Sequence, residues 1–177
     1  MVKSGATVAI IKEGKILLTK RKDFEVWCLP GGHVDEGESV AEAAIREARE
    51  EVGLEVELTR FVGVYSRLGG DSSIHLNLFA AKITGGNLTP QPEEVLEIRY
   101  FAPDELPELM FWWHRQQIMD AFKGNEAVIW SFTVIPAEPV ASRQELYALQ
   151  ARSGLAPSDF YQYYFEKNGT HRIKRHL

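Results

Sequence analysis

The sequence predicts an α/β domain over residues 1–124, with a mixed sheet and helices on its faces, followed by a C-terminal extension over residues 125–177. Short β-prone runs separated by glycine-containing turns alternate with two long helical patterns. The chain has 177 residues, of which 45% are hydrophobic and 25% are charged. A chain of this size and composition can bury a large core without disulfides.

Six β-prone runs and two helical patterns make up the predicted domain. The first two runs form a hairpin, because Lys12-Glu13-Gly14 separates them. Later runs end at turn residues such as Gly85-Gly86-Asn87. We expect strands at residues 7–11, 15–19, 26–29, 56–66, 74–83 and 95–102, and helices at residues 40–52 and 105–122.

The first of these helices carries signals for both of its ends. Ser39 and Glu42 form a capping box at its start, and Gly53 supplies a left-handed residue after its end. Apolar residues at helical spacing define a face that should pack on the sheet. These residues are Ala41, Ala44, Ile45, Ala48 and Val52.

Three glutamates, Glu47, Glu50 and Glu51, share another face of this helix. Carboxylates at this spacing repel one another by about 0.2–0.5 kcal/mol per pair, so stability gives no reason to group them. A hard divalent cation would resolve the repulsion, because it takes oxygen ligands and shares them with substrate phosphates. The alternative is a solvated acidic face. The glycine-rich loop at residues 30–37 favours the cation site, because its backbone can approach the acids closely.

The loop and the helix together resemble the signature of the Nudix hydrolases. That signature is a glycine, five residues, Glu, seven residues, Arg-Glu, an apolar residue, any residue, Glu-Glu, any residue, a glycine and an apolar residue. Every specified position is filled here, by Gly32, Glu38, Arg46, Glu47, Ala48, Glu50, Glu51, Gly53 and Leu54. The resemblance covers about residues 5–123, more loosely outside the signature.

The resemblance implies a fold, a reaction and a set of metal ligands. The fold is the Nudix-type α/β/α sandwich with a mixed sheet. The reaction is metal-dependent hydrolysis of a pyrophosphate bond in a nucleoside diphosphate linked to another moiety X. Nucleotide sugars such as ADP-ribose, (deoxy)nucleoside triphosphates and dinucleotides all remain open as substrates. The implied ligands of Mg²⁺ or Mn²⁺ are Glu47, Glu50, Glu51 and the Gly32 carbonyl.

Further charged residues are candidates for supporting the metal ligands or for acting as the general base. Glu38 and Arg46 are expected to form an ion pair that orients the loop and the ligating acids, with an ordinary surface pair as the alternative. For the general base, the family uses either a signature glutamate or one from a later loop. We favour Glu97 as an additional metal ligand or base, with Glu94 behind it. A solvated loop acid is the alternative for both.

Three basic residues are candidates for binding substrate phosphates. Arg21 follows the second predicted strand, and Arg67 and His75 flank a glycine-containing loop. Arginine suits this role because its planar fork binds phosphate with two hydrogen bonds. The alternative for each residue is a solvated surface position.

The extension has structural signals of its own, for a strand and two short helices. Residues 127–135 are strand-like, and Ser142 with Glu145 predicts a capping box for a helix to about Arg152. Five of residues 160–165 are aromatic, and such a cluster would form a sticky patch in water. We therefore expect the extension to pack on the domain or a partner subunit and to help bury a homodimer surface. A nucleobase clamp is the alternative.

Composition narrows the possible functions. The formal charge of −5 argues against a general nucleic-acid binder, and no run of 18 uncharged apolar residues is present. Cys28 is the only cysteine, which fits a cytoplasmic protein without disulfides. The expected partner is a small-molecule nucleotide. An enzyme is favoured over a non-catalytic Nudix-like nucleotide sensor or RNA-associated module, because no glutamate of the signature is lost.

Overall fold

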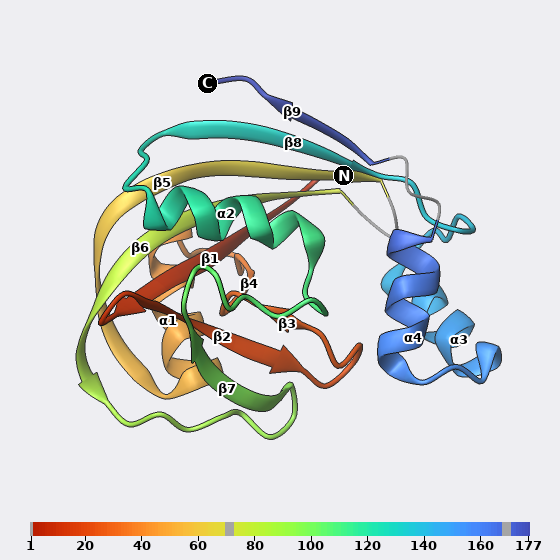
Figure 1. Cartoon of the computed structure of the whole chain (residues 1–177), viewed down its shortest axis with the longest axis horizontal. Coiled ribbons are helices and arrows are strands. Elements are labelled where there is room, and N and C mark those ends of the chain that lie inside the picture. Colours follow the sequence, from red (N-terminus) through yellow and green to blue (C-terminus); the bar gives the residue numbers. More distant parts are fainter. Residues whose placement is uncertain (1, 70–72, 168–170) are drawn as a thin grey trace.

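A computed structural model describes residues 2–69, 73–167 and 171–177. Its strands join in one mixed sheet with the order β3-β2-β1-β6-β5-β8-β9, to which β4 adds beside β1 and β7 beside β2 (Figure 1). The β1/β6 and β5/β8 pairs are parallel and the others antiparallel. The strands are β1 Lys3–Lys12, β2 Lys15–Arg21, β3 Trp27–Cys28, β4 Gly31–His33, β5 Leu54–Gly69, β6 Ile74–Gly86, β7 Val95–Phe101, β8 Val128–Val134 and β9 Arg172–Arg175. The predicted α/β class with a mixed sheet is confirmed.

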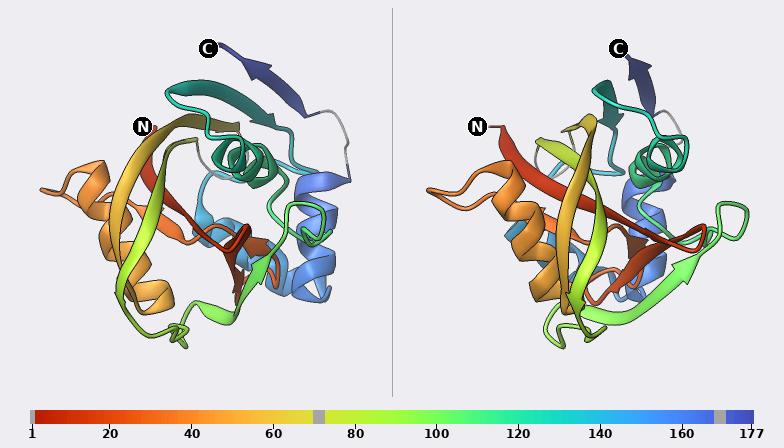
Figure 2. Two further views of the ribbon diagram at one scale, coloured as in Figure 1. Left: turned by 60° about the vertical axis from the view of Figure 1, so that its left-hand side comes forward. Right: turned by 90° about the vertical axis from the view of Figure 1, so that its left-hand side faces the viewer.

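Two helices cover opposite sides of the long strands (Figure 2). Helix α1, Val40–Val52, lies on one side over β1 and β5, and helix α2, Trp112–Phe122, lies on the other. Each side has its own hydrophobic core. In the described part of the chain, no helix is long and apolar enough to cross a membrane.

The local signals of the first hairpin and the first helix have the predicted results. Residues Glu13 and Gly14 both have positive φ angles, of 52° and 74°, as a two-residue hairpin turn requires. Ser39 and Glu42 form both hydrogen bonds of the capping box, and Gly53 ends α1 with φ of 73°. These short-range interactions define the ends of α1 at the predicted residues.

The buried face of α1 differs from the predicted one. Ala43 is fully buried, whereas Ile45 is 41% exposed. The helix is turned so that its small alanines approach the sheet and Glu51, at 3% exposure, faces inward. Ile45 therefore lies at the edge of the contact between α1 and the sheet, where it is partly exposed to solvent. The burial of an acid instead of an isoleucine is the first sign that this face serves more than packing.

The second helix is shorter than the predicted 105–122. Pro107 disfavours helical geometry in Leu106 before it and cannot donate a hydrogen bond of its own. Residues after it pair with β3 instead, since Trp27 N donates to Leu109 O and Phe111 N donates to Trp27 O, both at 3.0 Å. Helix α2 therefore begins only at Trp112.

The extension adds to the same sheet and the same core. Strand β8 pairs with β5, and the chain continues through α3 Arg143–Ser153, α4 Pro157–Tyr161 and the π-helical turn η1 Gln162–Glu166. The side chains of Phe160, Tyr161, Tyr164 and Phe165 are at most 2% exposed and belong to the core on the α2 side. Ser142 caps α3 as expected, although Glu145 accepts its return hydrogen bond from Ala141 N.

A hydroxyl of the extension also caps α2. The sequence provides no side-chain cap for this helix, because its N-cap residue is Phe111. Tyr161 Oη accepts a hydrogen bond from Trp112 N at 3.1 Å and donates one to Met110 O at 2.9 Å. One tyrosine thus satisfies a backbone donor that the first turn of a helix leaves without an internal partner.

Truncating a buried ring of the extension should destabilise the whole protein. We predict that Phe160→Ala lowers the free energy of unfolding by about 3–5 kcal/mol, because a fully buried ring is replaced by a cavity. Urea denaturation measures the change, with the exposed Leu155→Ala as the control. Equal, small effects of both substitutions would show that the extension does not share the core of the domain.

Candidate active site

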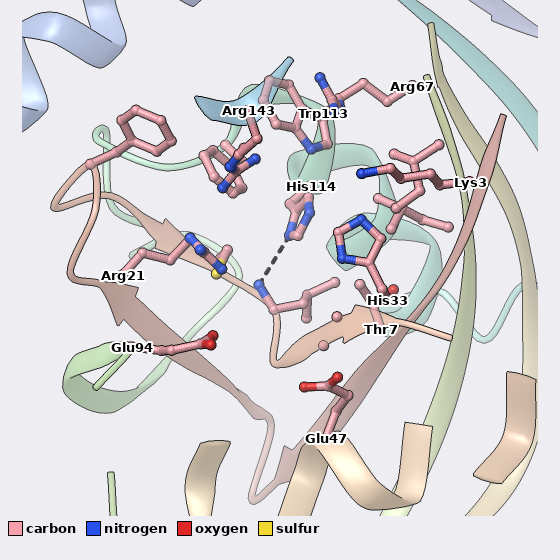
Figure 3. Close-up of a pocket in the computed structure, with 18 of the residues that line it drawn as sticks. Lys3, Thr7, Arg21, His33, Glu47, Arg67, Glu94, Trp113, His114 and Arg143 are labelled. Atoms are coloured by element: carbon pink, nitrogen blue, oxygen red, sulfur yellow. Dashed lines mark hydrogen bonds between the residues drawn. The ribbon is translucent and has the colours of Figure 1, made fainter. Parts of the chain in front are cut away.

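A cavity of about 440 Å³ opens beside α1 and the β3–β4 loop. Figure 3 shows Glu47 and Glu94 on one side of it, Lys3, Arg67 and Arg143 on the other, and His114 between them. The walls come from β1, the end of β2, β3, β4 and α1, from residues of β5 and β6, and from the segment before β7. The start of α2 and, from the extension, α3 and η1 complete them. The cavity therefore has an acidic side and a basic, partly aromatic side.

Arg46 organises the acids on α1. Its guanidinium donates to Glu38 at 2.6 and 3.1 Å, to Glu47 at 2.8 Å and to Glu50 at 3.0 Å. It also donates to His33 O at 3.0 Å, which ties the helix to the loop before it. The expected Glu38–Arg46 ion pair is present, and Arg46 holds two more glutamates of the signature in addition.

Two glycines of β4, Gly31 and Gly32, bring their backbone against the carboxylates of Glu51 and Glu47. Gly31 N donates to Glu51 Oε2 at 3.0 Å. A Cβ atom at Gly32 would collide with the carboxylate of Glu47, so no other residue fits there without displacing that acid. The strand pairing of Ala6 with Gly32 fixes the loop on the sheet. The segment therefore places a backbone amide beside Glu51 and the Gly32 backbone beside Glu47.

Burial and mutual repulsion of Glu47 and Glu51 favour the binding of a cation beside them. Burial raises the pKa of Glu51 to about 8, although the hydrogen bond from Gly31 and the charge of Arg21 oppose the shift. Burial also raises the pKa of Glu47, and the charges of Glu50 and Glu94 add to this effect. Crowded, partly buried carboxylates of this kind are the oxygen ligands that Mg²⁺ and Mn²⁺ take.

The ion-free arrangement is not already a closed metal site. Among the described residues, no three acidic, histidine or cysteine side chains are grouped closely enough to hold an ion. Arg46 instead bridges Glu47 and Glu50 with its Nη1 atom. The donor set nevertheless fits a divalent cation, because the carboxylates of Glu47 and Glu50 line the cavity and Glu51 lies on the same helix face.

The structure favours Glu94 over Glu97 at the acidic side. Glu94 lines the cavity, and its charge acts on both Glu47 and Glu51. Glu97 does not line it; its carboxylate pairs with Arg99 on β7 and is 42% exposed. A turn explains the difference, because Gln91 N donates to Glu51 O and Val95 N donates to Gln91 O, which directs the residues just before β7 toward α1. The structure therefore places Glu94 at the cavity and Glu97 outside it.

Of the three basic residues predicted to bind phosphate, two line the cavity and one does not. Arg21 and Arg67 line the cavity, whereas His75 lies outside it, where it shares a 2.8 Å hydrogen bond with Ser66. Arg21 forms a bidentate pair with Asp23 at 2.8 and 2.9 Å. Arg67 stacks over the Trp113 ring with its Cζ atom 5.3 Å from the centroid. Two of the three basic candidates therefore line the cavity.

His114 and Arg143 are among the cavity residues that sequence reasoning missed. Burial lowers the pKa of His114 to about 3, so the ring is neutral, and its Nδ1 accepts a 3.0 Å hydrogen bond from Leu29 N. The proton is accordingly assigned to Nε2. Arg143 reaches the cavity from α3. Neither residue is part of a motif, so only the tertiary structure reveals them.

A carboxylate cluster that fits a cation, facing arginines across a cavity, defines a hydrolase of phosphoanhydrides. The NUDIX domain model matches residues 1–122, and the chain belongs to the Nudix family. It is accordingly an enzyme that hydrolyses a pyrophosphate bond in a nucleoside diphosphate linked to another moiety. Its complete signature agrees with this activity and not with a non-catalytic sensor.

Individual relatives support the family and the fold. A protein of Bacillus subtilis named "Putative 8-oxo-dGTP diphosphatase" is 40% identical over 72% of this chain and 85% of its own length. An ADP-ribose pyrophosphatase of Methanocaldococcus jannaschii is 38% identical over 58% of this chain and 63% of its own. The crystal structure of a Mutator MutT protein from Bacillus halodurans matches 98% of both chains with a TM-score of 0.69 at 18% identity. That likeness concerns the fold, and it includes the extension.

The raised pKa of Glu51 predicts how stability depends on pH without metal. The folded-state pKa of about 8 exceeds the ordinary value of 4.5, so the folded protein binds this proton more tightly than the unfolded chain does. The resulting stabilisation is complete below pH 4.5 and is lost as the pH rises through about 8. Urea denaturation in EDTA at pH 5, 6.5 and 8 measures this loss.

Glu51→Gln is the matched variant for this measurement, because it keeps the shape of the side chain and removes the titration. Its stability should decline less than that of the wild type between pH 5 and 8. Parallel declines of the two proteins would mean that Glu51 does not bind a proton in this range.

Proposed function

We propose that this enzyme cleaves nucleoside triphosphates, including oxidised ones, and uses Mg²⁺ or Mn²⁺. The proposed ligands of the ion are the carboxylates of Glu47, Glu50 and Glu51 and the carbonyl oxygen of Gly32. One observation carries the proposal: Gly31 and Gly32 lie directly against the buried Glu51 and against Glu47, and Glu47 lines a cavity that arginine side chains also line. When bound, a divalent ion neutralises the diphosphate and the charge that develops at phosphorus.

The residues of the chain have distinct proposed roles around that ion. Arg46 and Glu38 orient the ligating acids through their shared hydrogen bonds. Arg21 and Arg67 bind phosphate oxygens from the basic side. Glu94 accepts a proton from the attacking water, because it lines the cavity near Glu47 and Glu51. Glu97 and His75 lie outside the cavity, and we propose no role for Glu97 in metal binding or catalysis and none for His75 in substrate binding.

Two of the relatives suggest different substrates. The name of the Bacillus subtilis relative points to a modified nucleoside triphosphate, and its match spans most of both chains. The name of the Methanocaldococcus jannaschii relative favours ADP-ribose as the second candidate. A panel of nucleoside triphosphates, 8-oxo-dGTP and ADP-ribose, with products identified by mass, decides between them. In ¹⁸O-labelled water, the label should enter a phosphate product; label found only on a sugar carbon would contradict hydrolysis at phosphorus.

We also propose a homodimer and a cytoplasmic location. Strand β9 lies at the edge of the sheet, and its Ile173 is 56% exposed; Ile129 of the neighbouring β8 is 40% exposed. An unpaired edge with apolar side chains is suited to pairing with a second copy. The buried free thiol of Cys28 fits a reducing compartment. Sedimentation equilibrium tests the dimer, and a monomer at micromolar concentration would refute it.

Metal removal and one ligand substitution test the metal site. We expect EDTA to abolish turnover and excess Mg²⁺ or Mn²⁺ to restore it. Glu51→Gln should lower kcat by at least ~10²-fold and reduce the rise in Tm that the ion produces, because a ligand is lost. Undiminished turnover in EDTA, or an equal rise in Tm for both proteins, would exclude a metal at Glu51.

Substitutions of two neighbouring acids, Glu94 and Glu97, test the assignment of the general base. Glu94→Gln should lower kcat by about 10²–10⁴-fold, the usual contribution of a general base. Glu97→Gln is the matched control on the same segment, and its kcat should stay within about 3-fold of the wild type. The reverse order of the two variants in steady-state kinetics would restore Glu97 as the base.

A further inference from the structure

Part of the cavity wall lies outside the family domain. The family model ends at residue 122, yet Arg143 and Tyr147 of α3 and Phe165 of η1 line the cavity. Helix α3 is separated from the signature helix by about 90 residues of sequence, so its presence at the site is a product of the fold alone. The extension is therefore positioned to take part in substrate selection.

Asp23 anchors this part of the extension to the domain. Its Oδ2 atom accepts hydrogen bonds from Arg143 Nη2 and Tyr147 Oη, both at 3.0 Å, and from Arg21 Nη2 at 2.8 Å. Arg143 Nε donates to Tyr147 Oη at 3.0 Å, and Gln150 Nε2 donates to Asp23 O at 2.7 Å. The Arg143 guanidinium is thus held in one orientation, which pre-organises it for binding.

The surroundings of Arg143 suit a flat, aromatic group. In Figure 3, Arg143 lies across the cavity from Glu47, with His114 between them. Its Cζ atom lies 5.6 Å from the Phe24 ring centroid. The rings of Phe111 and Trp113, which also line the cavity, stack at 4.7 Å. A substrate whose diphosphate lies beside the glutamates would extend its nucleobase into these aromatic surroundings.

The polar groups on this side are hydrogen-bond donors. Arginine has only N–H groups, and neutral His114 presents its Nε2–H because Nδ1 is occupied by Leu29 N. Guanine and other 6-oxopurines offer two acceptors, O6 and N7, on one edge, and an arginine can bind both. Adenine replaces O6 by an amino group, which is itself a donor.

We propose that Arg143 of the extension is a specificity-determining residue that selects 6-oxopurine nucleotides over adenine nucleotides. This inference rests on the proposed hydrolysis of nucleoside triphosphates. Arg143 contacts the base and not the reacting phosphorus, so its removal weakens binding of the ground state and transition state alike. The effect then falls on KM and leaves kcat nearly unchanged.

Kinetics with dGTP, dITP and dATP test the proposal. The wild type should prefer dGTP and dITP to dATP by at least ~10-fold in kcat/KM. Arg143→Gln should remove most of this preference by raising KM for the 6-oxopurines, with kcat within about 3-fold of the wild type. Arg152→Gln, at the exposed end of the same helix, is the control and should keep the preference. An unchanged ratio of dGTP to dATP in Arg143→Gln would overturn the proposal.

Two further measurements keep this test independent of folding and of catalysis. Arg143→Lys retains the charge beside Asp23 but not the fork, so it should lose the preference even where Arg143→Gln fails to fold. Thermal shifts by dGMP and dAMP report base selection without turnover. A larger shift by dGMP in the wild type, absent in Arg143→Lys, supports the inference even if no triphosphate is hydrolysed. Equal shifts by the two mononucleotides in the wild type would refute it.

Discussion

The burial of the Glu51 carboxylate beneath the Gly31 amide is the interaction on which the site depends. An isolated buried carboxylate is costly, and this one lies near Glu47 with like charge. Its position is fixed from three directions: by the sheet-facing turn of α1, by the loop glycines, and by Gln91, whose amide donates to the carbonyl of Glu51. Without a cation, the protein meets this cost by retaining a proton on Glu51 and by placing Arg46 among the remaining acids.

This arrangement connects the fold to the chemistry. Gly31, whose amide holds Glu51, belongs to β4, which pairs with β1 within the sheet. The cap of α2 comes from Tyr161, and the orientation of Arg143 comes from Asp23 in the β2–β3 turn. The extension thus completes both the core and the cavity wall. Acidic residues of the domain face basic residues of the domain and the extension across the cavity. Such a cavity suits a substrate with a charged centre and an aromatic end.

The parts of the structure that the sequence could predict are those fixed by short-range interactions. The ends of α1 follow from the Ser39 capping box and the left-handed Gly53, and the first hairpin follows from its two turn residues. The spacing of the signature was sufficient to group the glutamates and Arg46. Each of these features depends on residues fewer than about ten positions apart.

The features that sequence reasoning missed depend on contacts between distant segments. Helix α2 starts where Tyr161, almost 50 residues later, caps it, and no local signal marks that residue. The choice between Glu94 and Glu97 depends on a turn that is tied to the end of α1. Arg143 sits in a helix whose own sequence shows only a cap and no apolar face toward a site. Ile45 was predicted to be buried, but the face of α1 that packs inward contains Ala43 and Glu51, and Ile45 is 41% exposed.

Proton release on metal binding tests the central claim most directly. Isothermal titration of Mn²⁺ into the metal-free protein at pH 7, in buffers of different ionisation enthalpy, counts the protons that leave when the ion binds. Because Glu51 is protonated at this pH in the ion-free protein, we expect wild type to release close to one proton per bound ion and Glu51→Gln to release almost none. Binding of Mn²⁺ by the wild type without proton release would contradict the account, since Glu51 would then be either already ionised or not a ligand.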